Sequence, residues 1–310
     1  MSPLLAKEMT RANSPQGEVA IQNMEANKAT YRTCVGFFCY TTNTVFVHCR
    51  NAGRLLSRFL SNPGEKHYEA VMYAIGFLSY KQDEYLEYKR SVNFDGVFRL
   101  FTMVDADLGG DHTRGPNANS VMSGVTFLNE SHCYSYSKTI KAVCLATYQS
   151  EYYALTEGSQ MRIWLARVLR DLEFDVSFPV PVVGDNQSAL ATASVPETKQ
   201  SRHINLREHW IRSVLHVGDL IVAFIPGKMN AANVGTKILA RVQFELEGSW
   251  YLRGIHSIDY QKQIGPVLKE LWHRAHQWKI ETDKKRKRQA KGNVSSVSGN
   301  KFEANSGEEA

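Results

Sequence analysis

The chain has 310 residues, of which 43% are hydrophobic, 11% aromatic and 22% charged. These fractions are those of an ordinary globular protein, so they exclude a wholly disordered, collagen-like or coiled-coil chain. The formal net charge is +6, but five consecutive basic residues stand together at 284–288. The basic character therefore belongs mainly to one segment near the C-terminus.

The five cysteines form an odd set without C-x-x-C or C-x-x-H pairs. Structural zinc needs closely paired ligands, and a disulfide framework needs an even count in a secreted chain, so we expect neither. No apolar stretch reaches the roughly 18 residues that a membrane span requires, and the first residues lack the apolar stretch of a signal peptide. We therefore expect a protein of the nucleus or cytoplasm that is neither secreted nor bound to a membrane.

The two ends of the chain differ in composition from its middle. Residues 1–30 mix polar and charged residues without periodicity, which predicts a mobile leader. Residues 31–95 carry apolar side chains at three- and four-residue spacing, which predicts a small helical segment. Residues 281–310 are basic and then rich in Ser, Gly and Asn, a composition typical of a disordered tail. Between the middle and that tail we expect a helical extension over residues 248–280.

From residue 97 onward, strand patterns and helical patterns alternate. Alternating or short apolar runs predict strands at Val97–Asp105, Ser120–Leu128, His132–Ser137, Val180–Gly184 and Leu220–Ile225. Helical spacing predicts helices over residues 150–172, 186–193, 204–217 and 231–246. In the first of these helices, apolar residues recur at positions 154, 158, 161, 165, 168 and 172. The order of elements, βββαβαβα, predicts an α/β fold.

Three acidic residues stand where these elements begin or end. Asp105 and Asp185 lie at strand ends, and Glu151 lies in the first turn of a helix expected to pack on the same sheet. Taken singly, such an Asp commonly starts a turn, and such a Glu complements the helix dipole. Together, three carboxylates repel one another unless a cation holds them. Because hard oxygen ligands suit Mg²⁺ or Mn²⁺, we predict a divalent cation site.

Four segments carry a resemblance to a known family. Segments 104–111 (VDADLGGD), 150–155 (SEYYAL), 185–189 (DNQSA) and 202–212 (RHINLREHWIR) stand in this order along the chain. They resemble the S-D-A-D-W-A-G-D, A-E-Y-x-A-L, D-N-Q-S-A and K-H-I-D-I-R-x-H-F-I-R motifs of the ribonuclease H region of copia-type retrotransposon polyproteins. Upstream, Leu56–Phe59, Asn62-Pro63 and His67 look like the end of the family's reverse transcriptase.

The resemblance implies a ribonuclease H-like mixed five-stranded sheet flanked by helices over residues 97–247, preceded by a small helical remnant of the reverse transcriptase over residues 31–95. The implied activity is hydrolysis of the RNA strand of an RNA–DNA hybrid by two divalent ions about 4 Å apart, Mg²⁺ or Mn²⁺, which activate water and stabilise the leaving oxygen. The implied metal ligands and catalytic residues are Asp105, Glu151 and Asp185.

The sequence departs from the family pattern in two places that matter for activity. Segment 230–237 reads NAANVGTK where the family has N-x-A-D-x-x-T-K, so the fourth catalytic position is held by Asn233. A neutral amide oxygen attracts a second cation less than a carboxylate does, so we expect reduced activity. No Y-x-D-D motif occurs, so the chain is not a polymerase by itself. The alternative is a catalytically inactive nucleic-acid-binding fragment, or a remnant of the element.

Two basic groups are candidates for contact with nucleic acid. The expected phosphate contacts, which would recognise the hybrid by its backbone, are Arg202, His203, Arg207 and Arg212. Their alternative role is a solvated helix face. The basic run fits a nuclear localisation signal or a second nucleic-acid contact, and the alternative is a solubilising tail. That run consists of Lys284, Lys285, Arg286, Lys287 and Arg288.

Overall fold

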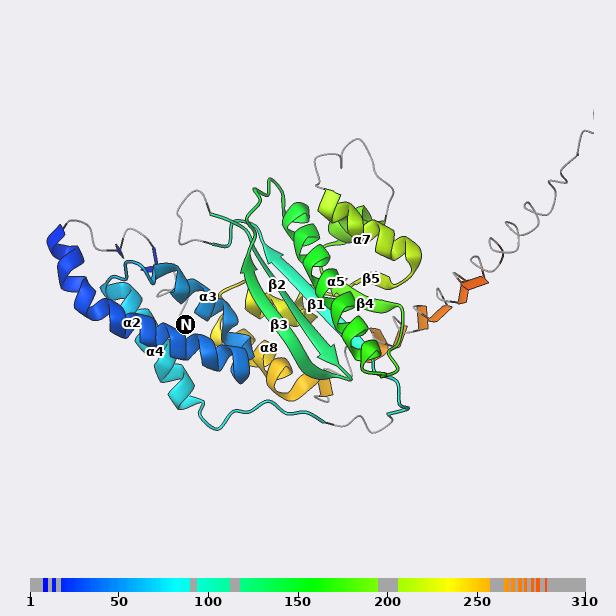
Figure 1. Ribbon diagram of the computed structural model, residues 1–310, viewed down its shortest axis with the longest axis horizontal. Coiled ribbons are helices and arrows are strands. Elements are labelled where there is room, and N and C mark those ends of the chain that lie inside the picture. The colour runs from blue at the N-terminus through cyan, green and yellow to red at the C-terminus, as the bar shows by residue number, and fades with distance from the viewer. Residues whose placement is uncertain are drawn as a thin grey trace, which may run out of the picture.

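The computed structural model describes residues 8–10, 13–14, 18–89, 94–111, 118–194 and 206–256, and scattered residues between 265 and 288. At its centre is a mixed five-stranded sheet in the order β3-β2-β1-β4-β5 (Figure 1). The strands are β1 (Leu100–Asp107), β2 (Val121–Leu128), β3 (Ser131–Thr139), β4 (Val180–Gly184) and β5 (Leu220–Phe224). The first three pair antiparallel, while β4 pairs parallel to β1 and to β5. The predicted fold class is confirmed.

Helices cover both faces of this sheet. The α-helices of the described residues are α2 (Glu18–Thr44), α3 (Arg50–Leu56), α4 (Glu65–Tyr80), α5 (Thr147–Asp171), α6 (Gln187–Ser194), α7 (Leu206–Val217) and α8 (Arg241–Arg253). Short 3-10 turns are η2 (Val47–Cys49), η3 (Ser57–Phe59), η6 (Gly227–Met229), η7 (Ala231–Gly235) and η8 (Gly254–His256). No helix of the described part combines the length and the apolarity needed to cross a membrane.

The alternation of β1 divides the core into two layers. Leu100 and Val104 pack with α5, α6 and α7 on one face, whereas Phe101 and Met103 pack with η7 and α8 on the other. The hairpin between β2 and β3 closes at Asn129 and Glu130, whose φ angles of 46° and 72° suit a tight two-residue loop. Both layers hold the strand ends of β1 and β4 in place, and those ends carry the candidate site.

Helices α2, α3 and α4 form a third cluster with its own buried core, which includes Tyr31, Val35, Leu56 and Val71. In Figure 1 they lie to one side of the sheet, next to β3, and α3 contacts that strand. Helix α2 begins at Glu18, so helical structure extends into the segment expected to form a mobile leader. The division of the chain into segments 31–95 and 97–247 stays a prediction.

Several predicted element boundaries differ in the structure, and two of these differences affect the candidate site. Strand β1 continues past Asp105 to Asp107, because Asp107 still pairs with Val121 of β2. The single helix predicted over residues 231–246 is wrong, since η7 ends at Gly235 and α8 begins only at Arg241. The chain leaves the helical path between them because Thr236 and Lys237 turn toward Asp105, which they both contact. Helix α8 then crosses the predicted boundary at residue 247.

Candidate metal centre

Three acidic side chains meet at one edge of the sheet. Asp105 lies on β1, Asp185 directly follows β4, and Glu151 lies near the start of α5. One carboxylate oxygen of each lies within 4.8 Å of those of the other two. The convergence follows from topology, because β1 and β4 are parallel neighbours and their carboxyl ends meet at the same edge. Asp105 is fully buried and Glu151 is 6% exposed.

Two glycines allow the elements around this site to approach closely. A Cβ added to Gly158 of α5 would lie 2.4 Å from Cγ1 of Val104, so only glycine lets α5 pack this tightly on β1. A Cβ added to Gly227 would lie 2.7 Å from an oxygen of Asp185. The first contact brings the helix that carries Glu151 onto β1. The second lets turn η6 pass directly over Asp185.

The electrostatics of the site favour a cation. Burial raises the pKa of Asp105 to about 6, even though Lys237 and Thr236 act in the opposite direction. Burial, and then the neighbouring charges of Asp105 and Asp185, raise the pKa of Glu151 to about 9. Both shifts mean that negative charge is costly here without a counter-ion. Three clustered carboxylate oxygens are also the donors that hard divalent ions prefer, so these residues fit Mg²⁺ or Mn²⁺.

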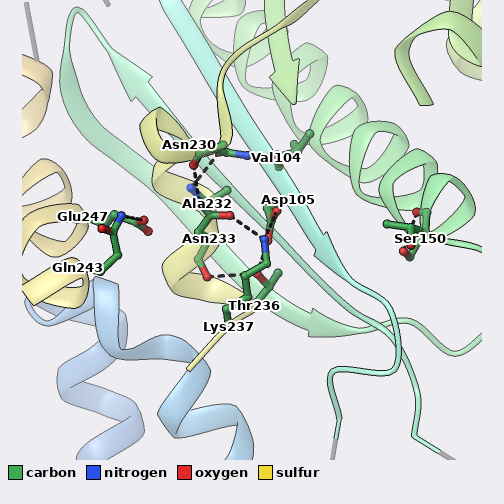
Figure 2. Close-up of polar contacts among 12 residues, drawn as sticks. Val104, Asp105, Ser150, Asn230, Ala232, Asn233, Thr236, Lys237, Gln243 and Glu247 are labelled. Carbon is green, nitrogen blue, oxygen red and sulfur yellow. Dashed lines mark hydrogen bonds and ion pairs between the residues drawn. The ribbon is translucent and has the colours of Figure 1, made fainter. Parts of the chain in front are cut away.

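Both oxygens of Asp105 are already in contact with one short segment of the chain (Figure 2). The hydroxyl of Thr236 donates to Oδ2 of Asp105. The Nζ of Lys237 donates to Oδ1 of Asp105 at 3.0 Å and to Oδ1 of Asn233 at 2.9 Å. Burial alone would lower the pKa of Lys237, but Asp105 raises it, so the ammonium form is favoured. The buried Asp105 is thus paired with a cation of the protein itself.

Two asparagines fix this segment against the sheet. The Nδ2 of Asn230 donates to the backbone oxygen of Val104 at 2.8 Å, and its Oδ1 accepts from the backbone N–H of Ala232 at 3.2 Å. The Nδ2 of Asn233 donates to the backbone oxygen of Gly227 at 2.7 Å. Both polar atoms of the Asn233 side chain are therefore engaged. An aspartate at 233 would keep the contact with Lys237 but lose the donor to Gly227.

Sequence reasoning did not identify Thr236, Lys237 or Glu247 as neighbours of the site. Thr236 and Lys237 belong to the same NAANVGTK segment as Asn233, and the resemblance of this segment to the family motif is the feature that could have indicated them. Glu247 of α8 is 1% exposed and accepts from Nε2 of Gln243 at 2.5 Å. Burial raises the pKa of Glu247 to about 7. Glu247 stands alone in a helical pattern, and no feature of the neighbouring sequence indicates that its side chain is buried.

The predicted nucleic-acid contacts are only partly described by the structure. Arg202 and His203 lie outside the described residues, and so does the side chain of Arg207, although its backbone belongs to α7. The Nε of Arg212 donates to the backbone oxygen of Thr192 at 3.1 Å, which ties α7 to α6. In the basic run, Lys284 and Arg288 are helical, whereas Lys285, Arg286 and Lys287 lie outside the described residues.

Comparison with known proteins finds similar sequences among retrotransposon polyproteins. It is 32% identical over 232 residues to the "Retrovirus-related Pol polyprotein from transposon TNT 1-94" of Nicotiana tabacum, a match that covers 74% of this chain. It is 25% identical over 215 residues to the corresponding polyprotein from transposon RE2 of Arabidopsis thaliana, which covers 69% of this chain. The homologues of the chain are thus retrovirus-related Pol polyproteins of copia-type plant transposons.

This Pol-related chain spans 17% of the length of the tobacco polyprotein and 14% of that of RE2. Among solved structures, LC11-RNase H1, isolated from compost by a metagenomic approach, is similar with 18% identity and a TM-score of 0.33. That match covers 44% of this chain and 91% of the other. A search of protein-family models found no match.

Proposed function

We propose that this Pol-related chain is a ribonuclease H-like protein that hydrolyses the RNA strand of RNA–DNA hybrids with the help of Mg²⁺ or Mn²⁺. The observation that carries the proposal is the convergence of Asp105, Glu151 and Asp185 within 4.8 Å at the carboxyl edge of a ribonuclease H-like sheet. The similarity of the chain to a Pol polyprotein supports it. The chain covers a small share of that polyprotein, and the proposal concerns this part alone.

Each acidic residue has a distinct position in the proposed site. Asp105, on the central strand, would hold the metal from the sheet side, while Glu151 and Asp185 would hold it from α5 and from the loop after β4. When bound, a divalent ion activates water for attack on the phosphodiester and stabilises the leaving oxygen. Asn233, at the fourth position, is neutral and its Oδ1 already accepts from Lys237, so we propose that the activity is weaker than four carboxylates would support.

Discrimination of the hybrid would rest on backbone geometry and on the 2′-hydroxyl, because an enzyme that cuts RNA in a hybrid has no need to read bases. Arg202, His203 and Arg207 remain proposed phosphate contacts. Arg212 is the weakest member of this group, because its Nε already serves the contact between α7 and α6. A variant that removes Arg202 should raise the KM for the hybrid more than it lowers kcat.

The test is cleavage of an end-labelled RNA–DNA hybrid by the purified full chain, in Mg²⁺, in Mn²⁺ and in chelator. We expect metal-dependent cleavage of the RNA strand only, and its loss in Asp185→Asn purified in parallel. The matched control is Asp171→Asn, at the far end of α5. Cleavage that survives equally in Asp185→Asn, or in chelator, would contradict the proposal.

A second candidate function is binding of nucleic acid without cleavage. It is favoured by one observation, the pairing of the Lys237 ammonium with Asp105 and Asn233, which puts a protein cation beside the proposed metal ligands. The two functions are distinguished by fluorescence anisotropy with the same hybrid. Binding that weakens with salt, accompanied by no cleavage in either metal, would favour the second function.

We also propose a role for the basic run at 284–288 in nuclear import. A fluorescent fusion of the full chain should accumulate in the nucleus, and deletion of residues 284–288 should shift it toward the cytoplasm. The control is deletion of five residues at 301–305, which removes a single lysine. An unchanged distribution would count against the import role and leave the contact with nucleic acid as the proposal to test.

A further inference from the structure

A lysine contacts one of the three carboxylates that would hold the metal. The Nζ of Lys237 is 3.0 Å from Oδ1 of Asp105 and 2.9 Å from Oδ1 of Asn233, and Figure 2 shows the side chain directed at both. Asp105 is the fully buried member of the acidic cluster and lies on β1, the central strand of the sheet. The ammonium therefore stands on the side of Asp105 where the fourth family position, Asn233, also lies.

The lysine is held in this place by the backbone and not only by its charge. Its N–H donates to the backbone oxygen of Asn233 at 2.9 Å, and its own backbone oxygen accepts from Nδ2 of Asn51 at 3.4 Å. Asn233 is in turn fixed by its bond to Gly227. Helix α3, the sheet edge and turn η7 thus all contribute to the position of one ammonium group.

We propose that Lys237 takes the place of one of the two divalent ions, so that this centre binds a single divalent ion. The inference rests on the proposed function, because it concerns the same acidic cluster. Lys237 would be the permanent cation on the side of Asn233, and Asp105, Glu151 and Asp185 would hold the exchangeable ion.

The charge balance of the site supports a single ion. Ionised, the three carboxylates of the cluster carry three negative charges, and Asn233 adds none. One divalent ion and the Lys237 ammonium together carry three positive charges and neutralise them. Two divalent ions and the ammonium would carry five, and unpaired charge in a largely buried site is costly. A carboxylate at 233 would leave two ions and the ammonium with one positive charge in excess, five against four. Removal of the Lys237 charge as well would balance two ions, four against four.

The first test counts bound Mn²⁺ on the full chain, from the electron paramagnetic resonance signal of the free ion. We expect the unmodified chain to bind one Mn²⁺, and the double variant Asn233→Asp/Lys237→Met to bind two. The matched control is Lys66→Met, which removes an exposed lysine of α4 that also pairs with a carboxylate, that of Glu69. This control should bind one Mn²⁺.

The second test needs only the single variant Lys237→Met and measures the melting temperature in chelator and in Mn²⁺. Removal of the built-in cation should lower the melting temperature in chelator, and Mn²⁺ should then raise it by more than it does in the unmodified chain. Lys66→Met should respond like the unmodified chain. This comparison tests the proposal even if the double variant does not fold.

The outcomes separate the two proposals. Two Mn²⁺ bound to the unmodified chain would overturn the role of Lys237 and leave the proposed nuclease function standing. A second ion that fails to bind to the folded double variant, or an equal Mn²⁺ effect on the melting temperatures of Lys237→Met and the unmodified chain, would overturn it as well. No Mn²⁺ bound to the unmodified chain would overturn both proposals, because the acidic cluster would then not be a metal site.

Discussion

The guanidinium of Arg58 in η3 donates to Oδ2 of Asp111, a residue that follows β1 and whose carboxylate is fully buried. Arg58 also donates to the hydroxyl of Thr139 at the end of β3 at 2.6 Å, and Arg54 of α3 lies 3.8 Å from Oδ1 of Asp111. One buried carboxylate therefore connects the cluster of helices α2 to α4 with the sheet, at the same end of the sheet as the proposed metal centre.

Removal of this carboxylate should loosen the contact between the two parts of the chain. Asp111→Ala leaves two partly buried guanidinium groups without their anion, so we expect a loss of about 3 kcal/mol in the free energy of unfolding. Urea denaturation followed by circular dichroism measures it. The control is Asp95→Ala, which breaks an exposed ion pair with Arg99 and should change stability little. Equal effects of both variants would show that the Arg58 contact does not hold the parts together.

We expect that the native Arg162 of α5 lowers the free energy of unfolding of the protein. Its side chain is fully buried, and none of its three guanidinium nitrogens has a hydrogen-bond partner among the described residues. Burial lowers its pKa well below the ordinary value. We expect Arg162→Met to raise the free energy of unfolding by about 2 kcal/mol, because it removes an unsatisfied polar group and keeps the apolar stem. The control Arg167→Met, on the exposed side of α5, should have little effect, and a destabilised Arg162→Met would contradict the prediction.

Stabilisation by Mg²⁺ should increase with pH. The pKa values of Asp105, about 6, and Glu151, about 9, lie above their ordinary values mainly because both groups are buried. The folded chain then keeps protons that the unfolded chain has released, so the metal-free protein loses stability as the pH rises from about 4 toward 9. Mg²⁺ replaces those protons at the carboxylates. The rise in melting temperature on addition of Mg²⁺ should therefore be greater near pH 8 than near pH 5.5.

The measurement is thermal unfolding across this pH range, in Mg²⁺ and in chelator. Glu151→Gln is the informative variant, because it removes the group with the larger shift and should flatten the pH dependence in chelator. A Mg²⁺ effect that is the same at both pH values would mean that neither carboxylate contacts the ion.

Two buried histidines should make the protein sensitive to acid. His48 and His132 are 3% and 4% exposed, and burial lowers the pKa of each to about 3. Below the unfolded-state pKa of about 6.5, the unfolded chain binds more protons than the folded one, so stability is present above that pH and falls as the pH drops toward about 3. We expect each histidine to cost about 2 kcal/mol between neutral pH and about pH 5.

Urea denaturation of the unmodified chain and of His48→Leu/His132→Leu at about pH 7.5 and about pH 5 isolates this effect, because the carboxylates of the metal centre titrate alike in both proteins. The double variant should lose less stability on acidification. If both proteins lose the same amount, the histidines are not the acid-sensitive groups.

Local patterns in the sequence were enough for the strands and for three members of the candidate site, whereas the mixed five-stranded sheet was implied by the family resemblance. Alternation placed Phe101 and Met103 on one face of β1 and Leu100 and Val104 on the other, and the structure packs them in two separate layers. Strand ends and a helix start singled out Asp105, Glu151 and Asp185, which the structure brings together. Such features are readable because the backbone geometry of a strand or helix repeats over a few residues.

Periodicity did not identify which side of α5 is buried. The apolar spacing that predicts this helix includes Leu172, which is 61% exposed, while Arg162 at a position outside that spacing is fully buried. The spacing of apolar residues reports that a helix is amphipathic, but the neighbours that pack on it decide which stripe is covered. Here α5 packs on β1, β2 and β4, and Ser159 and Arg162 are among its fully buried residues.

Only the tertiary structure decided the environment of the metal centre. The contact of Lys237 with Asp105 joins residues 132 positions apart, and that of Arg58 with Asp111 joins residues 53 apart. No repeat of a strand or helix links such positions. Their proximity depends on how the strands are ordered in the sheet and how helices pack on it, and this long-range packing determines whether a residue such as Lys237 faces solvent or a buried carboxylate.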